Sequence, residues 1–463
     1  MQELASSVTD PSAPRYQRYF TPEEIRAIAA PPQEEYDSIL ADLRRHGVTV
    51  VRESSAHLSI TVRGERAYLA RLKAEVEFAK PRASNGIESS IESIVGLTNG
   101  PKRHHSSLLI RSMTDGDANG LQPPAIKQAY DFNPIYQAGF TGKGQHIAIA
   151  TYDAFYLQDI RDYYVMNHLD PMPSVDQVKF NGTPDDDVLS AVETESDAEF
   201  AGMIAPGASI HVFASAKNGD AGEQAIFTTI LDDNRSKIVT YSWGTLENTL
   251  DREHKKAMDA LFSRAVAQGV TIFVATGDGG AQVPDFPAGN PNVVAVGGTT
   301  LTDTSGARSE LAWSGSGGGI STFYPRPSYQ AGLDPKMGTG RDYPDVAFNA
   351  DPSSGQPTWV HYDPTSPMSA PDAPSYYIIG GTSIASPQWA GFMALVDEAR
   401  GSKKHLGLLN PWIYAIPTAS VGDYFNDIVS GSNGMYSAGP GFDLVTGLGS
   451  MMASALFSYL QAL

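Results

Sequence analysis

Ser383 stands where an apolar strand pattern passes through Gly380 and Gly381 into a long helical pattern, in the segment SYYIIGGTSIASPQWAGFMALVDEAR. This order places Ser383 at a helix N-terminus, beside backbone N–H groups that could hold a developing oxyanion. The two glycines would let a carbonyl group approach closely. The local pattern alone supports a nucleophilic serine and an ordinary helix cap about equally.

A pair of carboxylates, Glu193 and Asp197, lies in the segment AVETESDAEFAGMIAPGA. Residues four apart share one helical face, where two like charges disfavour joint ionisation. At low pH such a pair can share a proton, which raises the pKa of one carboxyl group and lets the pair accept a serine proton. A solvated acidic helix face is the alternative, but the apolar stretch before A-P-G-A favours burial.

Asp278 ends the strand pattern TIFVATGDGG. An ionised aspartate would repel a tetrahedral oxyanion, so in that role the residue must be protonated to donate a hydrogen bond. A simple strand-end turn explains G-D-G-G equally well without further information.

These motifs together resemble those of one enzyme family. G-T-S-x-x-x-P around Ser383 is shared by subtilisin-like and sedolisin-like serine peptidases, but none of the ten histidines lies in the H-G-T-H setting of a subtilisin-like base. The run E-x-x-x-D-x-E before A-P-G-A is similar to that of the sedolisins, or serine-carboxyl peptidases. The resemblance implies Ser383 as nucleophile, Glu193 as general base and acid, Asp197 as its orienting partner and Asp278 in the oxyanion hole.

The resemblance extends over about residues 121–463, through YSWG, FPAGNPNVVAVGGT, WSGSGGGIS and RDYPDVAFNADP. Trp243, in YSWG, could orient the carboxylate pair, line a subsite or belong to the core. Glu195 and Glu199 are alternatives to the pair by residue type, but they do not fall on the family motif.

A glycine-rich segment near the end, FNDIVSGSNGMYSAGPGFDLVTGLG, resembles the calcium loop of the same family. Carboxylate and backbone oxygens suit a hard cation such as Ca²⁺. The resemblance implies one calcium ion, held by side chains of Asp427 and Asp443 and by carbonyl oxygens of Ile428, Gly439 and Gly441.

A second calcium-like pattern, DGDANG at residues 115–120, copies the first half of an EF-hand loop. Its twelfth position is Ile126 instead of a glutamate, and Pro123 and Pro124 interrupt it. We interpret it as part of a linker.

The elements that must position these residues alternate between strand and helix. The segments QHIAIATY, SIHVFAS, KIVTYSW, TIFVATG and NVVAVGG predict buried strands, with helical stretches between them. This α/β alternation predicts a mainly parallel sheet flanked by helices, with function at the carboxyl ends of the strands. The resemblance makes it a subtilisin-like fold.

The N-terminal part is predicted as a separate α+β unit in the order helix, strand, strand, helix. Its Y-x-x-Y-F-T-P-E-E motif resembles the activation domain of the sedolisins, which has a ferredoxin-like arrangement and normally starts with a further strand. Only fifteen residues precede Tyr16 here. We expect a pro-domain at residues 1–80, an exposed linker with the processing site at residues 81–120, and a catalytic domain at residues 121–463.

Composition limits the partners. The chain has 463 residues, 52 acidic and 33 basic, and a formal net charge of -19, which disfavours nucleic acid and anionic membrane surfaces. The absence of cysteine excludes disulfides and thiolate metal sites. No apolar run suggests a membrane span. No signal peptide is visible at the start, although we expect a secreted monomer.

We therefore predict an acid-acting serine-carboxyl endopeptidase that is made as a proenzyme, cleaves proteins or peptides and is inhibited by its own pro-domain. Three alternatives remain: a tripeptidyl-peptidase type of exopeptidase, a subtilisin-like neutral protease, and a non-catalytic relative that binds peptides in the same cleft.

Overall fold

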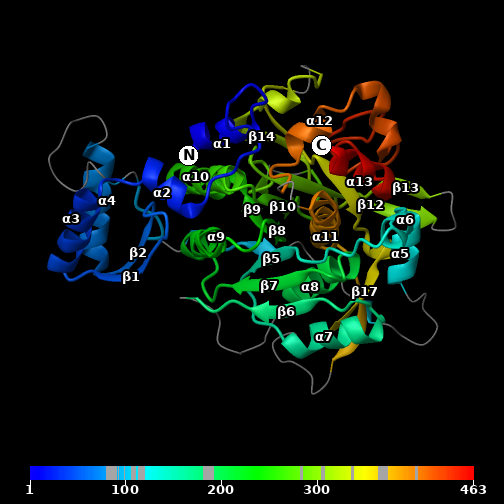
Figure 1. The fold of residues 1–463 in the computed structure, drawn as a ribbon, viewed down its shortest axis with the longest axis horizontal. Coiled ribbons are helices and arrows are strands. Elements are labelled where there is room, and N and C mark those ends of the chain that lie inside the picture. The colour runs from blue at the N-terminus through cyan, green and yellow to red at the C-terminus, as the bar shows by residue number, and fades with distance from the viewer. Residues whose placement is uncertain are drawn as a thin grey trace.

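A mainly parallel sheet forms the centre of the chain in the computed structural model (Figure 1). The structure describes residues 1–79, 91, 93–97, 100–105, 111–112, 120–180, 192–281, 285–303, 308–334, 338–362, 374–401 and 405–463. Within them, ten strands form this sheet, with β13 (Ser309–Ala312) antiparallel on β12 and the others in the order β6 (Ser174–Gln177), β7 (Ser209–Ala214), β5 (His146–Thr151), β8 (Ile238–Tyr241), β10 (Thr271–Ala275), β12 (Val294–Asp303), β16 (Val346–Asn349), β20 (Ser450–Met451) and β19 (Phe425–Asn426).

All five predicted strands are confirmed as β5, β7, β8, β10 and β12, and each is parallel to its neighbours among them. Their side chains alternate between two hydrophobic cores. Ile147 and Ile149 pack on one face of the sheet, whereas Ala148 and Ala150 pack on the other. Because both faces are covered, the strands read as continuous apolar runs.

Helices cover both faces. One face carries α8 (Val192–Ile204), α11 (Thr382–Arg400) and α13 (Ala453–Ala462), and the other carries α9 (Asp220–Asp233) and α10 (Arg252–Ala267). The remaining helices of this part are α5 (Pro123–Ala129), α6 (Asn133–Gln137), α7 (Leu157–Met166) and α12 (Asn410–Tyr414), with short 3₁₀ turns η2 (Glu247–Thr249), η3 (Ser328–Gln330), η5 (Pro352–Ser354) and η6 (Thr418–Asp423). This is the predicted α/β arrangement.

Small sheets extend the central one. They are β3 (His104–His105), β9 (Trp243–Leu246) and β11 (Asp285–Phe286); β4 (Arg111–Ser112), β18 (Ser375–Ile379) and β17 (Gln356–Val360); and the pair β14 (Gly319–Pro325) and β15 (Gly340–Tyr343). No helix in the described part of the chain has the length and apolar composition that crossing a bilayer requires.

The N-terminal unit has the predicted order of helices and strands: α2 (Pro22–Ala29), α3 (Gln33–Arg45), β1 (Thr49–Glu53), β2 (Ile60–Arg63) and α4 (Arg66–Ala79). Thr21 caps α2 through a reciprocal pair of hydrogen bonds with Glu24. Where the resemblance led us to look for a further strand, the chain forms a helix, α1 (Gln2–Thr9). Within the described residues, the sheet of this unit is one antiparallel pair, β1 with β2.

This unit lies against α9 and α10, at the left of the molecule in Figure 1. The backbone N–H of Phe20 donates to the carbonyl oxygen of Ala267 at 2.8 Å, and the Tyr19 hydroxyl donates to that of Leu406 at 2.6 Å. Arg52 forms an ion pair of 2.9 Å with Asp232. Several separate contacts therefore hold the two parts together.

Within residues 100–105 the expectation of an exposed linker is wrong for Arg103, whereas Lys102 and His104 are exposed. His104 and His105 form β3, which pairs antiparallel with Gly244 and Trp243 of β9. Arg103 is almost completely buried. The DGDANG pattern falls, except for its last glycine, outside the described residues.

Candidate active site

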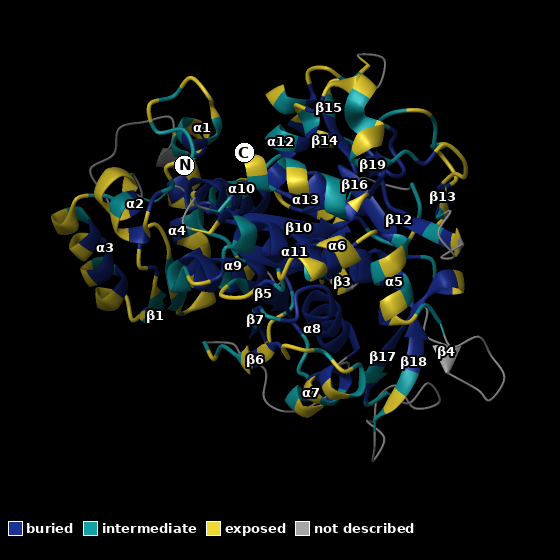
Figure 2. Cartoon of the chain, turned by 45° about the vertical axis from the view of Figure 1, so that its right-hand side comes forward, coloured by how far each residue is buried: buried dark blue, intermediate teal, exposed yellow. Residues whose placement is uncertain are grey.

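Helix α8, which carries the predicted carboxylate pair, is buried along its whole length. Figure 2 shows it in dark blue, the colour of buried residues. Its four carboxylates, at positions 193, 195, 197 and 199, are each at most 1% exposed. A helix buried all round has no solvated acidic face, which removes the alternative interpretation of this segment.

Ser383 lies in the first turn of α11, directly after β18 and the two glycines. Gly381 adopts a φ angle of +139°, which a side chain would rarely tolerate. A Cβ atom there would lie 2.5 Å from Oδ2 of Asp278 and 3.1 Å from Oγ of Ser383. The Asp278 carboxyl and the Ser383 hydroxyl therefore converge on the Cα of Gly381, although they are 105 positions apart in sequence.

Glu193 lies within this cluster. Burial raises the pKa of its carboxyl group well above the usual range, and the negative charges of Asp197, Asp278 and Asp153 act in the same direction. The Ser383 hydroxyl faces the Glu193 carboxylate and lowers its pKa. The contact between Ser383 and Glu193 is looser than a well-formed hydrogen bond, which is common for catalytic pairs without substrate.

Asp197 is held from the other side by Ser242, the first residue after β8. The Ser242 hydroxyl donates to Oδ1 of Asp197 at 2.7 Å and lies 3.4 Å from the carbonyl oxygen of Ser383. Burial raises the pKa of Asp197 well above its usual range, whereas this hydrogen bond lowers it. The carboxyl groups of Glu193 and Asp197 can therefore share one proton.

Asp278 follows β10 and is anchored to the start of α11. Its Oδ1 atom accepts hydrogen bonds from the backbone N–H of Thr382 at 2.7 Å and from the Thr382 hydroxyl at 2.9 Å. The same hydroxyl accepts a bond of 3.0 Å from the N–H of Gly277. These contacts leave Oδ2 directed toward Gly381 and the Ser383 hydroxyl. The structure thus brings together all four residues of the predicted site.

The sequence analysis missed two residues that contribute to this cluster. Asp153 follows β5, and its charge raises the pKa of Glu193. Ser242 follows β8, the next strand in the sheet, and bonds to Asp197. Asp153 directly follows the predicted strand QHIAIATY and Ser242 lies near the end of the predicted strand KIVTYSW, at the edge where the carboxyl ends of parallel strands meet. That position was the signal by which they could have been found.

The two acids that fall off the family motif have other partners. Glu195 accepts a hydrogen bond from the N–H of Tyr156 at 2.6 Å, and Glu199 accepts one from the Thr358 hydroxyl at 2.6 Å. Burial raises the pKa of both carboxyl groups well above the usual range. They join α8 to neighbouring segments and do not reach Ser383.

Trp243 occupies the start of β9 and is buried. Its indole N–H donates to the Thr151 hydroxyl at 3.2 Å, which in turn lies 2.8 Å from the hydroxyl of Thr194. Thr194 adjoins Glu193 on α8, so this chain of contacts fixes the start of the helix.

A cavity of about 340 Å³ opens beside Asp278. Asp285 lies in its wall, and burial together with the charge of Asp278 raises the pKa of the Asp285 carboxyl to about 8. The residues that line the cavity are Pro101, His104, Trp243, Gly244, Thr245, Leu246, Thr249, Ala275, Gly277, Asp278 and Asp285. The volume suits one side chain of a bound peptide.

The predicted calcium ligands also lie together. Oδ2 of Asp427 accepts a hydrogen bond of 2.9 Å from the N–H of Gly441, and Oδ2 of Asp443 accepts one of 3.2 Å from the N–H of Gly439. Burial raises the pKa of Asp443. Within the described residues, no cluster of three or more metal-binding side chains occurs. Two carboxylates with adjacent carbonyl groups fit an oxygen-preferring cation.

Comparison with known proteins adds independent information. Residues 189–410 match the profile of the subtilase family, and residues 1–75 match that of the pro-kumamolisin activation domain. Kumamolisin from Bacillus sp. (strain MN-32) is 34% identical over 421 residues, covering 82% of this chain and 72% of that protein. Sedolisin from Pseudomonas sp. (strain 101) is 26% identical over 517 residues, covering 100% of this chain and 85% of that protein.

More distant relatives include tripeptidyl-peptidase 1 from Homo sapiens, which is 23% identical over 524 residues, covering 99% of this chain and 89% of that protein. Among solved structures, Pseudomonas sedolisin (serine-carboxyl proteinase) complexed with pseudo-iodotyrostatin superposes with a TM-score of 0.62 at 27% identity, covering 75% of this chain and 99% of that one.

Proposed function

Because this chain belongs to the sedolisin family of serine-carboxyl peptidases, we propose that Ser383, Glu193, Asp197 and Asp278 form its catalytic centre. The family relationship makes the chain a serine-type peptidase that is synthesised as a proenzyme, with peptide substrates and its own pro-domain as inhibitor. The residues that carry out the reaction, and the conditions under which it proceeds, are the proposal developed below.

In the first step, Ser383 Oγ attacks the carbonyl carbon of the peptide and gives its proton to Glu193. The resulting oxyanion is held by the proton of Asp278 and by backbone N–H groups at the start of α11. Glu193 then passes its proton to the leaving amine, which leaves an acyl group on Ser383. Water, with Glu193 again as base, hydrolyses this ester and restores the serine.

One observation supports this division of roles above all others: Ser383 Oγ and Asp278 Oδ2 converge on Gly381, while Glu193 faces the same hydroxyl from α8. A reacting carbonyl carbon placed beside Ser383 would have its oxygen near Asp278. Because Glu193 lies close to Asp153, Asp197 and Asp278, the repulsion between their charges favours protonation of some of them. We therefore propose that the enzyme works in an acidic medium. Asp197 orients Glu193 and shares its proton.

We propose that residues 1–80 are the pro-domain, that cleavage within residues 81–120 releases it, and that residues 121–463 are the mature enzyme. The contacts of Tyr19, Phe20 and Arg52 with the catalytic part support this division. So does β3, because residues 104–105 lie on β9 in the way that an extended peptide would.

We further propose that one calcium ion is held by the side chains of Asp427 and Asp443 with carbonyl oxygens of Ile428, Gly439 and Gly441. A bound ion would neutralise these carboxylates and would fix the loop. No step of the reaction depends on it.

We propose that the enzyme acts outside the cell as a monomer and an endopeptidase, with no nucleic-acid or membrane partner. The net charge of -19 supports the last point, because it opposes approach to polyanions. Tripeptidyl-peptidase 1 among the relatives keeps exopeptidase cleavage as the alternative mode.

To test the catalytic proposal, the full chain and its Ser383→Ala and Glu193→Gln variants are incubated at about pH 4 and followed by mass spectrometry, with an unfolded protein as added substrate. We expect the parent chain to shorten and to cut the substrate, and both variants to remain intact and inactive. Unchanged cleavage by Ser383→Ala would overturn the proposal. A parent chain that neither cuts itself nor the substrate would favour a non-catalytic relative, and cleavage unaffected by Glu193→Gln would favour a base outside α8.

A further inference from the structure

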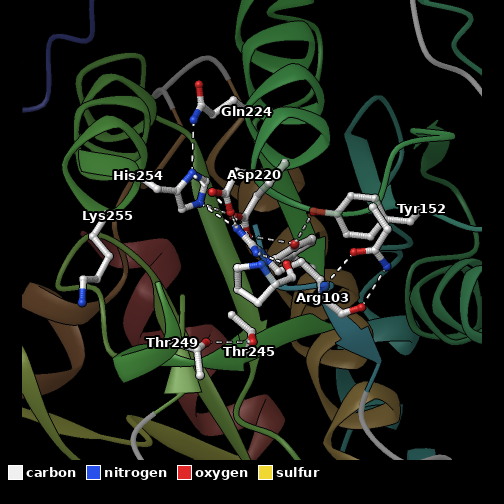
Figure 3. A network of polar contacts seen from close by, with 12 residues as sticks. Arg103, Tyr152, Asp220, Gln224, Thr245, Thr249, His254 and Lys255 are labelled. Atoms are coloured by element: carbon white, nitrogen blue, oxygen red, sulfur yellow. Dashed lines mark hydrogen bonds and ion pairs between the residues drawn. The ribbon is translucent and has the colours of Figure 1, made fainter. Parts of the chain in front are cut away.

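Arg103, a residue of the linker, fills a buried acidic pocket of the catalytic part (Figure 3). Its guanidinium Nη2 atom lies 2.9 Å from Oδ1 of Asp220 and 2.6 Å from Oε2 of Glu223. The Nε atom donates a further hydrogen bond of 3.1 Å to Glu223, and Nη1 donates to the carbonyl oxygen of Pro101. The side chain has no exposed surface.

The pocket is built entirely by the catalytic part. Asp220 and Glu223 belong to the first turn of α9, and His254 belongs to α10. His254 Nε2 lies 2.8 Å from Oε2 of Glu223 and 2.7 Å from Nη2 of Arg103, while the Tyr241 hydroxyl donates to Oε1 of Glu223 at 2.9 Å. Each of these side chains is at most 5% exposed.

The charges in this pocket match its occupant. Burial alone would raise the pKa of Glu223, but the charge of Arg103 and the contacts with His254 outweigh it and lower the pKa to about 2. Removing Arg103 would leave two buried carboxylates facing a single histidine. Such uncompensated buried charge is strongly unfavourable, so the empty pocket would favour another cation.

The backbone around Arg103 is held in a way that any peptide could reproduce. The Asn218 side chain accepts a hydrogen bond from the N–H of Arg103 at 2.6 Å and donates one to its carbonyl oxygen at 2.8 Å. The following residues pair with β9 as an added antiparallel strand. These contacts are made by the backbone of the strand and do not require particular side chains.

The direction of this strand points it to the catalytic serine. His104 pairs with Gly244 and His105 with Trp243, so a peptide continued in this register would next reach Ser242. Ser242 lies 3.4 Å, through its hydroxyl, from the carbonyl oxygen of Ser383. A peptide bound in the same way would therefore place the residue equivalent to Arg103 three positions before the residue that faces Ser242.

We infer that the pocket formed by Asp220, Glu223 and His254 is a substrate subsite for arginine, which recognises peptides with that residue at the fourth position before the cleaved bond. Arg103 occupies it in the proenzyme and leaves it on maturation. This inference rests on the proposed peptidase function. Arginine suits the pocket better than lysine, because several N–H groups of its planar guanidinium are bonded at once.

The first test needs no variant of the enzyme. The acid-matured protein is given peptides that differ only at the fourth position before the cleaved bond, where they carry arginine, lysine, citrulline or alanine. Citrulline has the shape of arginine without its charge. We expect kcat/KM to be about tenfold or more higher for arginine than for citrulline, from the loss of charge-assisted hydrogen bonds. Equal rates for the two peptides would overturn the inference.

The second test locates the preference. In Glu223→Gln the ratio of arginine to citrulline rates should fall toward one. Asp220→Asn provides a second variant in case Glu223→Gln does not fold. Glu253→Gln, which removes a carboxylate next to His254 in sequence that forms an ion pair with Lys256, is the matched control and should retain the ratio.

These outcomes separate the inference from the proposed function. If the enzyme cleaves all four peptides at similar rates, or if Glu223→Gln and Asp220→Asn retain the arginine preference, the subsite is wrong while the peptidase mechanism stands. If no peptide is cleaved and unfolded protein is also left intact, the proposed function itself fails, and the subsite fails with it.

Discussion

The Ser242 hydroxyl donates a hydrogen bond of 2.7 Å to Oδ1 of Asp197 and lowers the pKa of this carboxyl group, which burial raises. In Ser242→Ala the pKa of Asp197, and of the pair that it forms with Glu193, should rise further. Since the pair must lose a proton before it can accept one from Ser383, the acid limb of the pH profile of kcat/KM should move to higher pH. Ser242→Thr, which retains a hydroxyl, should move it less, and an unshifted limb in Ser242→Ala would contradict this role.

Asp278→Asn tests the limb of the pH profile of kcat/KM on which activity falls toward neutral pH. The Asp278 side chain can donate a hydrogen bond to an oxyanion only when protonated, whereas an asparagine donates at every pH. The acceptor atom that holds Thr382 is preserved in the variant. We expect the ratio of activity at about pH 7 to that at about pH 4 to increase tenfold or more over the parent. Using a ratio removes any general loss of activity, and an unchanged ratio would show that Asp278 does not set the neutral limit.

Much of this arrangement could be predicted from the sequence. The five central strands were predictable because both faces of a parallel sheet are buried, which gives continuous apolar runs. The four proposed catalytic positions were selected through the resemblance to the sedolisins, because the local patterns alone left a helix cap, an acidic helix face and a turn as alternatives. Ser242 and Asp153 were missed because a single polar residue after a strand is common. Their roles appear only when neighbouring strands of the sheet bring them to α8.

The linker was the main error, and its cause is physical. Residues 100–105 are polar and show no periodicity, which is typical of exposed chain. The burial of Arg103 depends on carboxylates at positions 220 and 223, more than a hundred residues away, and the strand that follows it depends on the edge of β9. No local pattern reports such distant partners. The sequence did not predict helix α1 for a similar reason, since its apolar side chains Ala5 and Val8 pack against residues of α10.

Stability should fall as the pH rises from acid toward neutral. Glu195 and Glu199 have folded-state pKa values well above those of unfolded carboxyl groups, which titrate at about 4. Between these values the unfolded chain has released protons that the folded chain still holds, so their stabilising effect is lost as the pH rises through the folded-state pKa. The double variant Glu195→Gln and Glu199→Gln should show a flatter dependence of Tm on pH in calorimetry. The same slope as in Ser383→Ala would argue against this assignment.

Removal of calcium should lower the thermal stability. An ion at a free concentration about a hundred times its Kd stabilises the folded chain by about 2.7 kcal/mol, so chelation should reduce Tm by several degrees. In Asp443→Asn the response to chelator and to added Ca²⁺ should disappear. Because Asp443 also accepts hydrogen bonds from Val445 and Thr446, Asp427→Asn serves as a second variant. A Tm of the parent chain that ignores both chelator and calcium would rule out the site.

Tyr19 should be a major contributor to binding of the pro-domain. Its ring lies so close to Gly407 that a Cβ atom there would come within 2.4 Å of the Tyr19 hydroxyl oxygen. We expect the separated pro-domain with Tyr19→Ala to inhibit the mature enzyme about ten to a hundred times more weakly. Tyr68→Ala, which removes a ring that stacks on His46 inside the pro-domain, is the control for a general loss of stability of that domain. Equal inhibition constants for Tyr19→Ala and the parent pro-domain would contradict the prediction.

The continuous chain between the docked N-terminal unit and β3 makes inhibition independent of how dilute the protein is. While residues 1–105 remain attached, the tether maintains a local concentration of inhibitor that for short linkers is on the order of millimolar. A single cut in the linker converts this intramolecular contact into an ordinary bimolecular equilibrium. Dilution after cleavage would then be enough to make activation irreversible, whereas concentrated enzyme would continue to inhibit itself. On the proposed route of activation, the decisive event would be a change in molecularity, which one peptide bond controls.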